Sequence, residues 1–363
     1  MKLQCSTAAL RDAVQLLQPV CPLRTTLPIL ANILVRAEDG RLALTGTDLD
    51  ISIKTHMPAE VSKEGETTIP VRFLLDALRR IDAESIELTV DAQHVAKIRA
   101  GAKVECSLRG MPPGEFPKFP SVQSQDAVEL SAKDLHAMFK CTAYAVSKDE
   151  TRYVLNGVCL HFGEKFDVVA TDGRRLAKCT NASIKRDTAR EIIVPTKSIG
   201  LIQALLNVEG TAQIKYSQSQ LEVNVGQTTL VTRLVDGHYP NYEQVIPKNC
   251  KYAVELNARA FLNAVNLASV VTEKTKQAVI RVALKDNQLT ISANTAEIGE
   301  VTDVLEVNYR GETLDIAFNP SYLTDVCQTI DSDQLVLEVT SGSSPAILRS
   351  GEQFLCVIMP MRI

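Results

Sequence analysis

The chain has 363 residues, 45% of them hydrophobic and 23% charged, and its formal net charge at pH 7 is −4. This length exceeds what one hydrophobic core usually organises, so the sequence predicts a globular protein of two or three domains. No run of apolar residues is long enough for a membrane span, and nine dispersed cysteines without CxxC spacing favour a reducing cytoplasm over disulfides or a metal site.

The predicted elements recur along the chain. The first is an amphipathic helix at residues 6–18, and similar helices are predicted at 131–146 and 257–271. Leu10, Leu135 and Phe261 hold matching positions in these helices, 125 and 126 residues apart. Each helix is followed by two alternating strands joined by a tight turn, and Asp-Gly or Asp-Asn in two of the turns tolerates a positive φ.

A strand, a proline and a second helix complete each copy. Pro70, Pro195 and Pro320 lie 125 residues apart, and they precede predicted helices at 71–81, 196–206 and 321–330. Proline suits the first turn of a helix, where its missing N–H would have no partner. Independent landmarks at one spacing indicate an internal repeat. The sequence therefore predicts an α+β protein of three tandem domains at 1–122, 126–247 and 250–363, each with two helices and about eight strands.

The six predicted helices are more basic than the rest of the chain. They hold eight basic and four acidic residues, a net charge of +4, which leaves −8 for everything else. This asymmetry favours a basic helical surface that binds a polyanion through phosphate contacts, without reading base sequence. Solvated faces of ordinary helices explain the same charges, so both interpretations stay open at this point.

Motifs for catalysis are missing from the sequence. There is no phosphate-binding loop, dinucleotide fingerprint, HExxH or GxSxG motif, and the five histidines are dispersed. Asp172 in Thr171-Asp172-Gly173 is better interpreted as a turn residue that bonds its own backbone than as an acid or base. We therefore predict a non-catalytic protein with no cofactor and no metal.

Several segments resemble the bacterial DNA polymerase III β subunit, the sliding clamp. They are residues 27–30 (LPIL), 44–49 (LTGTDL), 153–157 (YVLNG), 170–177 (ATDGRRLA), 234–237 (LVDG) and 357–363 (VIMPMRI). The resemblance covers nearly the whole chain and implies a head-to-tail homodimer, a ring of six domains with helices lining the central hole. It implies a processivity factor that encircles double-stranded DNA and tethers the replicative polymerase, the clamp loader and other proteins with a clamp-binding motif. The expected location is the bacterial cytoplasm, in association with the nucleoid.

The size of a helix-lined hole agrees with two chains. If helices pack about 10 Å apart, a ring of six helices leaves a hole of roughly 9 Å, which is narrower than the ~12 Å width of the major groove alone. Twelve helices leave about 28 Å, enough for a duplex and a layer of water. A ring of two chains fits DNA, and a ring of one chain does not.

The resemblance also implies a peptide-binding cleft between the second and third domains. Its matching positions are Leu155, Thr171, Gly173, Arg174, Arg175, Leu176, Pro240, Val245, Ser344, Val357, Ile358, Met359, Pro360, Met361 and Arg362. Methionines suit such a cleft because they adapt to several apolar anchors. Alternatively, the carboxyl-terminal residues only complete a sheet. Arg174 stands where relatives often carry histidine, and Gln244 where arginine is common, so peptide preference is expected to differ.

Contacts with DNA and with a second subunit follow from the same resemblance. Arg24, Arg80, Arg152, Tyr153 and Lys197 match DNA-contact positions, Lys148 is a plausible replacement for a polar contact, and Asp149 departs from the usual neutral residue. At the dimer interface we expect apolar Val270 and Val271, and pairing of Arg99 and Lys103 with Glu297 and Glu300.

Two other function classes compete with a clamp. One is a hydrolase that uses Asp172 and a distant histidine, which measurement of turnover would reveal. The other is a three-repeat adaptor that binds proteins and never DNA, against which the basic bias of the helices argues.

Overall fold

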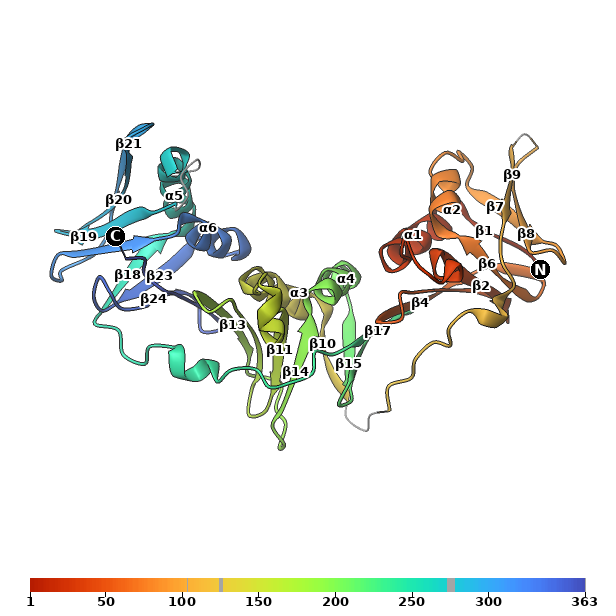
Figure 1. Ribbon diagram of the computed structural model, residues 1–363, viewed down its shortest axis with the longest axis horizontal. Helices are drawn as coiled ribbons and strands as arrows, with labels where there is room; N and C mark the ends of the chain where they lie inside the picture. Colours follow the sequence, from red (N-terminus) through yellow and green to blue (C-terminus); the bar gives the residue numbers. More distant parts are fainter. Residues whose placement is uncertain (103, 124–126, 273–277, 363) are drawn as a thin grey trace. The chain divides into compact units, whose positions relative to one another are not determined.

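The computed structural model describes residues 1–102, 104–123, 127–272 and 278–362 (Figure 1). The chain divides into two compact units, the first formed by residues 1–136 and 197–234, the second by residues 137–196 and 235–363. The division passes through the middle repeat, so each unit contains one outer repeat and part of the middle one. Residue 126, where the second domain was predicted to begin, lies outside the described residues.

The first unit begins with the elements of the first repeat. They are β1 (Lys2–Ser6), α1 (Thr7–Leu17), η1 (Gln18–Val20), η2 (Pro28–Ala31), β2 (Asn32–Glu38), β3 (Arg41–Thr47), β4 (Ile51–Pro58), β5 (Glu60–Lys63), β6 (Gly65–Pro70), α2 (Val71–Leu78), β7 (Ser85–Val90), β8 (Val95–Ala100), β9 (Val104–Arg109) and η3 (Pro113–Glu115). From the middle repeat it takes β10 (Ala127–Ser131), β15 (Thr211–Tyr216), β16 (Gln220–Val225), β17 (Thr228–Arg233) and nearly all of α4 (Thr196–Leu206). Helix α3 (Ala132–Thr142) starts in this part of the chain.

The second unit holds the rest of the middle repeat and the third repeat. Its middle-repeat elements are η4 (Ala143–Ala145), η5 (Glu150–Leu155), β11 (Gly157–Phe162), β12 (Phe166–Thr171), β13 (Arg175–Asn181) and β14 (Arg190–Pro195). Its third-repeat elements, after η6 (Tyr242–Val245), are β18 (Tyr252–Asn257), α5 (Ala258–Thr272), β19 (Ile280–Lys285), β20 (Gln288–Thr295), β21 (Gly299–Glu306), β22 (Leu314–Phe318), α6 (Pro320–Thr329), β23 (Gln334–Val339), β24 (Ala346–Ser350) and β25 (Phe354–Ile358).

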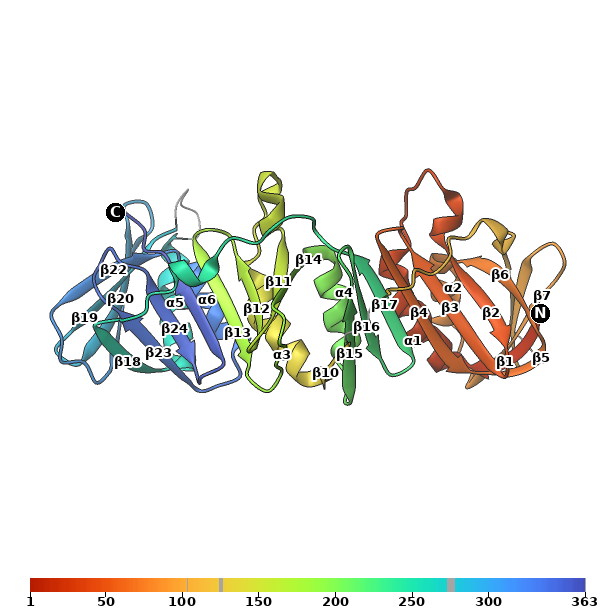
Figure 2. The ribbon, with the colours of Figure 1, turned by 90° about the horizontal axis from the view of Figure 1, so that it is seen from below.

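Each unit contains one eight-stranded and one smaller antiparallel sheet. In the first unit the strand orders are β10-β15-β16-β17-β4-β3-β2-β6 and β5-β1-β7-β8-β9. In the second they are β14-β11-β12-β13-β25-β24-β23-β18 and β21-β20-β19-β22 (Figure 2). Both large sheets join strands of two successive repeats, through β17–β4 and through β13–β25. The described residues thus hold nine, eight and eight strands in the three repeats, and the predicted α+β class with three tandem copies is confirmed.

Helix α1 forms where a capping residue precedes an apolar stripe. At α1 the Ser6 hydroxyl accepts the Ala9 N–H at 3.3 Å, and Leu10, Val14 and Leu17 are buried one to two turns apart. In each outer repeat the two helices, α1 with α2 and α5 with α6, lie side by side (Figure 1). The amphipathic pattern thereby buries one face of each helix against its own repeat.

Two predicted helix ends differ from the structure. The helix expected at 71–81 ends at Leu78, so Arg79 and Arg80 lie in the turn that follows it. The helix expected to reach residue 146 ends at Thr142, whose φ of −122° leaves the helical region, and a short 3₁₀ turn follows. Hydrophobic periodicity locates a helix well, but it locates helix ends poorly because the last turn often tightens or frays.

The tight turns between strands adopt the predicted backbone conformation. Asp39 and Gly40 have φ values of 49° and 70°, and Asp286 and Asn287 have 49° and 62°. Asp, Asn and Gly tolerate this left-handed region, and it matches the twist of the flanking strands. In the described part of the chain, no helix has the length and apolar character to span a membrane.

Candidate functional site

The turn between β12 and β13 is built by side chains that bond their own backbone. The Thr171 hydroxyl accepts the Gly173 N–H at 3.1 Å and donates to the Arg175 carbonyl at 2.6 Å. One Asp172 carboxylate oxygen accepts the N–H groups of Arg174 and Arg175 at 2.8 and 3.0 Å. Gly173 has a φ of +83°, where a glycine is favoured. The interpretation of Asp172 as a turn residue is confirmed.

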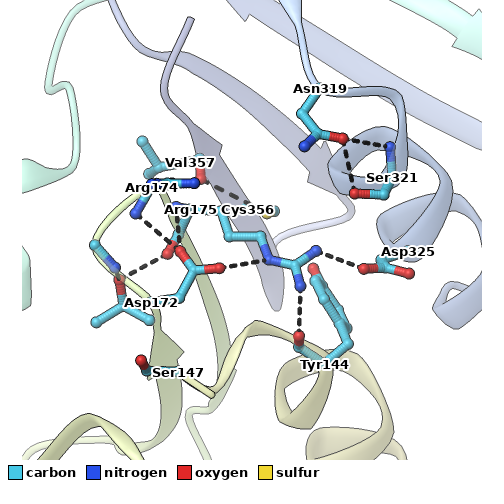
Figure 3. A network of polar contacts seen from close by, with 12 residues as sticks. Tyr144, Ser147, Asp172, Arg174, Arg175, Asn319, Ser321, Asp325, Cys356 and Val357 are labelled. Carbon is cyan, nitrogen blue, oxygen red and sulfur yellow. Dashed lines mark hydrogen bonds and ion pairs between the residues drawn. The ribbon is translucent and has the colours of Figure 1, made fainter. Parts of the chain in front are cut away.

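The Arg175 side chain lies at the centre of a polar network (Figure 3). Its guanidinium donates to Asp172 at 3.2 Å, to Asp325 of α6 at 2.5 Å, and to the Tyr144 carbonyl at 2.7 Å. It also lies 5.2 Å from the ring centre of Tyr144 and 4.6 Å from that of Tyr322. Burial alone would lower the pKa of Arg175, but the hydrogen bond and charge of Asp325 raise it. The network joins the middle repeat to the third repeat.

The carboxyl-terminal tail, residues 359–362, is held from both repeats. Strand β25 before it pairs with β13, with Leu176 opposite Val357. The Met359 N–H then donates to the Arg174 carbonyl at 2.9 Å, and the Met361 N–H donates to the Ala317 carbonyl at 2.8 Å. The tail therefore continues beyond its sheet as an anchored extended segment.

An apolar cluster lies beneath this joint. Leu155, Leu176 and Val357 are buried together with Tyr239 and Ile347 of the same cluster. Three residues that are near members of this cluster in the sequence are exposed to solvent. Val245 is 53% exposed, Met359 is 44% exposed, and Pro240 is exposed as well. The structure thus brings residues of the middle repeat, the 235–250 linker and the third repeat together around one apolar floor.

The tail also lines a pocket of about 560 Å³. Its lining includes Met359, Pro360, Met361 and Arg362 together with Arg281, Asp315, Ala317, Gly342 and Ser343. Ser344 is half-buried next to this pocket, and its hydroxyl pairs with that of Ser341 at 2.8 Å. Ile358, in contrast, is only 1% exposed, so its side chain contributes to the core of the sheet.

The 235–250 linker is fixed to the sheet by two tyrosines. The Tyr239 hydroxyl accepts the Thr171 N–H at 2.9 Å, while the Tyr239 N–H donates to Glu191 at 2.7 Å. Tyr242 lies over the sheet, with the Lys178 ammonium 5.4 Å from its ring centre. Burial raises the pKa of Tyr239 far above its ordinary value, so the phenol stays protonated. These contacts fix the linker that carries Pro240 and Val245.

The predicted DNA-contact residues fall in both units. In the first unit Arg24 and Arg80 are exposed, and Lys197 is 63% exposed while it pairs with Asp48. In the second unit the exposed residues Lys148, Arg152 and Tyr153 lie in or next to η5.

Asp149 lies in the middle of this second group. Its carboxylate accepts the hydroxyl and the N–H of Thr151, and these bonds lower the pKa of Asp149. It also lies 3.6 Å from the Arg152 guanidinium. Part of the positive charge of Arg152 is therefore offset by a neighbour.

The expected dimer residues are placed unevenly. Val270 is 60% exposed, but Val271 is 6% exposed and packs inside its own repeat. Arg99 pairs with Glu105 of the neighbouring strand at 3.0 Å. Glu297 and Glu300 are exposed, and Lys103 lies outside the described residues. Among these residues, Val270 is the one that presents an apolar side chain to solvent.

Sequence reasoning missed the partners of Arg175. Asp325, Tyr322 and Tyr144 belong to helical segments far from the turn, and Asp325 is 150 residues away. A carboxylate that interrupts the apolar face of α6 was the one available signal, and it is weak. Within the described ranges, no three His, Cys, Asp or Glu side chains gather as metal ligands would.

Comparison with known proteins agrees with this architecture. Residues 1–120, 129–241 and 243–362 match the family models for the N-terminal, central and C-terminal domains of the DNA polymerase III beta subunit. A beta sliding clamp of Haemophilus influenzae is 32% identical over 355 residues, 96% of either chain, and one of Chlamydia muridarum is 31% identical over all of this chain and 99% of its own. The chain belongs to the bacterial β sliding clamp family.

Solved clamp structures share the fold over the full length. The DNA polymerase III subunit beta of Pseudomonas aeruginosa, crystallised bound to griselimycin, has a TM-score of 0.95 at 30% identity, with both chains fully covered. The Bacillus subtilis DNA polymerase sliding clamp has a TM-score of 0.94 at 27% identity and covers 100% of this chain and 99% of its own. This clamp is thus a non-catalytic processivity subunit, and neither the hydrolase nor the adaptor alternative is favoured.

Proposed function

We propose that this clamp tethers its partners through a single peptide pocket in the second unit. The observation that carries the proposal is the apolar floor of Leu155, Leu176 and Val357. Val245, next in sequence to Ile246 that packs on this floor, and Met359, which follows the strand of Val357, are both exposed. Burial of a partner's apolar side chains on such a floor supplies affinity, while the extended tail offers backbone groups to an extended peptide. The remaining predicted cleft residues, apart from the buried Ile358 and the ion-paired Arg175, are proposed as walls and turns of the same joint.

The partners are proposed by class. Replicative polymerase, clamp loader and other replication or repair proteins would present a short peptide with Gln, Leu and Phe anchors. Griselimycin, with which the Pseudomonas aeruginosa relative was crystallised, is a second probe for the same pocket. Competition between griselimycin and a polymerase peptide for this clamp would support a shared site.

The peptide pocket is tested by Met361→Ala. This change removes flexible apolar lining from the tail pocket, which we take to be part of the proposed peptide pocket, and it keeps the backbone bond to Ala317. We expect the dimer to stay intact and a polymerase peptide to bind about tenfold more weakly, the equivalent of about 1.4 kcal/mol. Met111→Ala is the matched control, because Met111 is also half-buried but packs beside the Ile29 and Leu30 cluster of the first repeat. Unchanged affinity with an unchanged melting temperature for Met361→Ala would show that the pocket lies elsewhere.

We also propose that two chains form a head-to-tail ring around duplex DNA. Strand β9 ends one sheet and β21 ends another, and such edges can pair with each other between two chains. On α5, Leu267 and Val270 are 49% and 60% exposed, and they supply an apolar contact beside that edge. Val271 is buried and is not part of this contact, and pairing of Arg99 and Lys103 with Glu297 and Glu300 remains a prediction.

The ring is tested by mass and by topology. A solution mass near twice the 39.7 kDa chain at micromolar concentration supports the dimer, and a mass of one chain contradicts it. The proposed DNA contacts are Arg24, Arg80, Lys148, Arg152, Tyr153 and Lys197. Because these contacts are few, retention of the clamp on DNA should depend on encirclement more than on local affinity for phosphates. The clamp should stay on nicked circular DNA and leave once the circle is cut. Equal retention on both forms would contradict encirclement.

Two further proposals concern the units of duplication and the location of the protein in the cell. The repeats at 1–122, 126–247 and 250–363 are the units of duplication, although the sheets cross from one repeat to the next. The proposed location is the cytoplasm beside the nucleoid, because the proposed substrate is chromosomal DNA. Co-sedimentation with nucleoids that is lost after nuclease treatment would support this location.

A further inference from the structure

The guanidinium of Arg175 is not arranged to meet a partner peptide. Its side chain is only 10% exposed, and its nitrogens donate to Asp172, to Asp325 and to the Tyr144 carbonyl (Figure 3). A guanidinium has five N–H donors in a rigid fork, so three separate acceptors fix its position and orientation. The residue therefore acts through its neighbours and not by contact with a ligand.

A chain of direct contacts leads from α6 to the carboxyl-terminal tail. Asp325 holds the Arg175 guanidinium, which also holds the Asp172 carboxylate. The other oxygen of that carboxylate accepts the backbone N–H groups of Arg174 and Arg175, which sets the shape of the turn. The carbonyl of Arg174 in the same turn accepts the Met359 N–H at 2.9 Å. The place where the tail leaves its sheet is thus tied to a carboxylate on a distant helix.

We propose that Asp325 is a positioning residue for partner binding, which through Arg175 and Asp172 sets the position of Met359 at the edge of the peptide pocket. The proposal rests on the proposed function of that pocket. The Asp325 side chain is 35% exposed, whereas Arg175 is 10% exposed, so the ion pair connects a buried cation to a carboxylate at the protein surface. Loss of the Asp325 charge leaves Asp172 as the one carboxylate on that buried cation among the described residues, and the turn that Asp172 shapes then shifts or loosens.

A second ion pair nearby provides a control. Lys140 and Asp331 pair at 2.8 Å, also between the middle and third repeats, and Asp331 is 82% exposed. This pair has no contact with the turn or the tail that the structure records. An exposed pair of this kind contributes little to stability, so Asp331→Asn matches Asp325→Asn in chemistry but not in position.

The test is amide hydrogen exchange on the full-length clamp, read residue by residue, beside titration with a polymerase peptide. In Asp325→Asn we expect the Met359 amide to exchange roughly tenfold faster, in the range found for coupled residues of one ion-pair network. The Met361 amide donates to Ala317 within the third repeat and should exchange as in the wild type. The peptide should bind several-fold more weakly, while Asp331→Asn changes neither quantity.

A double variant that combines Asp325→Asn with Arg175→Lys distinguishes a positioning role of Asp325 from a general loss of stability. Lysine keeps the charge but cannot reach three acceptors, so Arg175→Lys should change Met359 exchange and peptide affinity as Asp325→Asn does. In the double variant, both quantities should be the same as in Arg175→Lys alone. Additive effects would overturn the proposal. Equal acceleration of Met359 and Met361 would also overturn it, because it indicates general loss of stability.

Failure of the peptide pocket would be recognised separately. If the wild-type clamp binds no polymerase peptide, the proposed pocket is wrong, yet the exchange of Met359 still decides whether Asp325 positions the tail. If the wild type binds and Asp325→Asn leaves both Met359 exchange and peptide affinity unchanged, the positioning role is refuted.

Discussion

The joint between the first and second repeats contains a pair of hydroxyls that should behave as one unit. Thr55 on β4 and Thr228 on β17 lie directly opposite each other, both buried, with their hydroxyl oxygens 2.8 Å apart. Valine has nearly the shape of threonine, so Thr55→Val or Thr228→Val removes one hydroxyl and leaves the other buried without its partner. Such a group costs about 1–3 kcal/mol, whereas replacing both partners by apolar groups of the same shape is nearly neutral.

The expected result is therefore strong non-additivity. Each single variant should destabilise the β4–β17 pairing by about 1–3 kcal/mol, and the double variant should be about as stable as the wild type. Global unfolding of a chain with several repeats need not be two-state, so the suitable assay is native-state amide exchange of the β4 and β17 backbone. It reports the free energy of opening at the joint itself.

Thr229→Val supplies the control for this cycle. Thr229 is next to Thr228 but donates to Asn224 within the middle repeat at 2.7 Å, so its effect should add to that of Thr55→Val. If Thr55→Val and Thr228→Val add to within about 0.5 kcal/mol, the two hydroxyls do not share a bond in solution, and the reasoning fails.

Three further outcomes are expected. Val270→Asp places a charge in the proposed apolar dimer contact and should yield monomers at micromolar concentration by mass measurement, while an intact dimer would remove Val270 from the interface. Arg24→Ala should reduce the salt dependence of DNA binding by nearly one phosphate contact. Lys197→Ala should reduce it by less, because Asp48 already offsets the Lys197 charge. A larger reduction in Lys197→Ala than in Arg24→Ala would contradict this reasoning. Burial, followed by nearby basic side chains, lowers the pKa of His56 from its usual 6.5, so the unfolded chain binds a proton that the folded chain does not. The free energy of unfolding should therefore fall as the pH drops below about 6.5. When unfolding is measured across that range, His56→Gln should show a smaller dependence on pH.

The repeat and its turns were predictable because their causes are local. Asp39 with Gly40, and Asp286 with Asn287, mark turns by their tolerance of positive φ, whichever strands they join. Pro70 and Pro195 each precede a helix, and Pro320 opens one, because at a helix start the missing proline N–H costs no hydrogen bond. These signals depend on a few neighbouring residues, so one sequence is enough to read them.

The joints between repeats could not be predicted from the residues themselves. The pairing of β13 with β25 brings together segments about 180 residues apart, and alternation within a strand does not specify its neighbour. The same limit applies to side chains. Arg175 in the turn motif was assigned to the peptide cleft, but its guanidinium is directed to Asp325 by tertiary packing. Val271 shares the apolar character of Val270, and only the helix rotation decides that Val271 is buried.

The chain forms the same joint twice, and the proposed peptide pocket lies at the second copy. In the first repeat the turn after β3 repeats the later one bond for bond, with Thr47 and Asp48 in the places of Thr171 and Asp172. The Asp50 carbonyl accepts the Arg233 N–H at 2.9 Å, as the Arg174 carbonyl accepts the Met359 N–H.

Two differences separate these joints. Ile51, which is 2% exposed, stands where the second turn has Arg175, so the first joint has an apolar residue in place of the ion-paired one. After Arg233 the chain continues into the 235–250 linker, whereas after Met359 it continues as a short tail that lines a pocket. We therefore propose that the duplicated joint becomes a binding site at its second copy, with one pocket per chain and two in the proposed dimer.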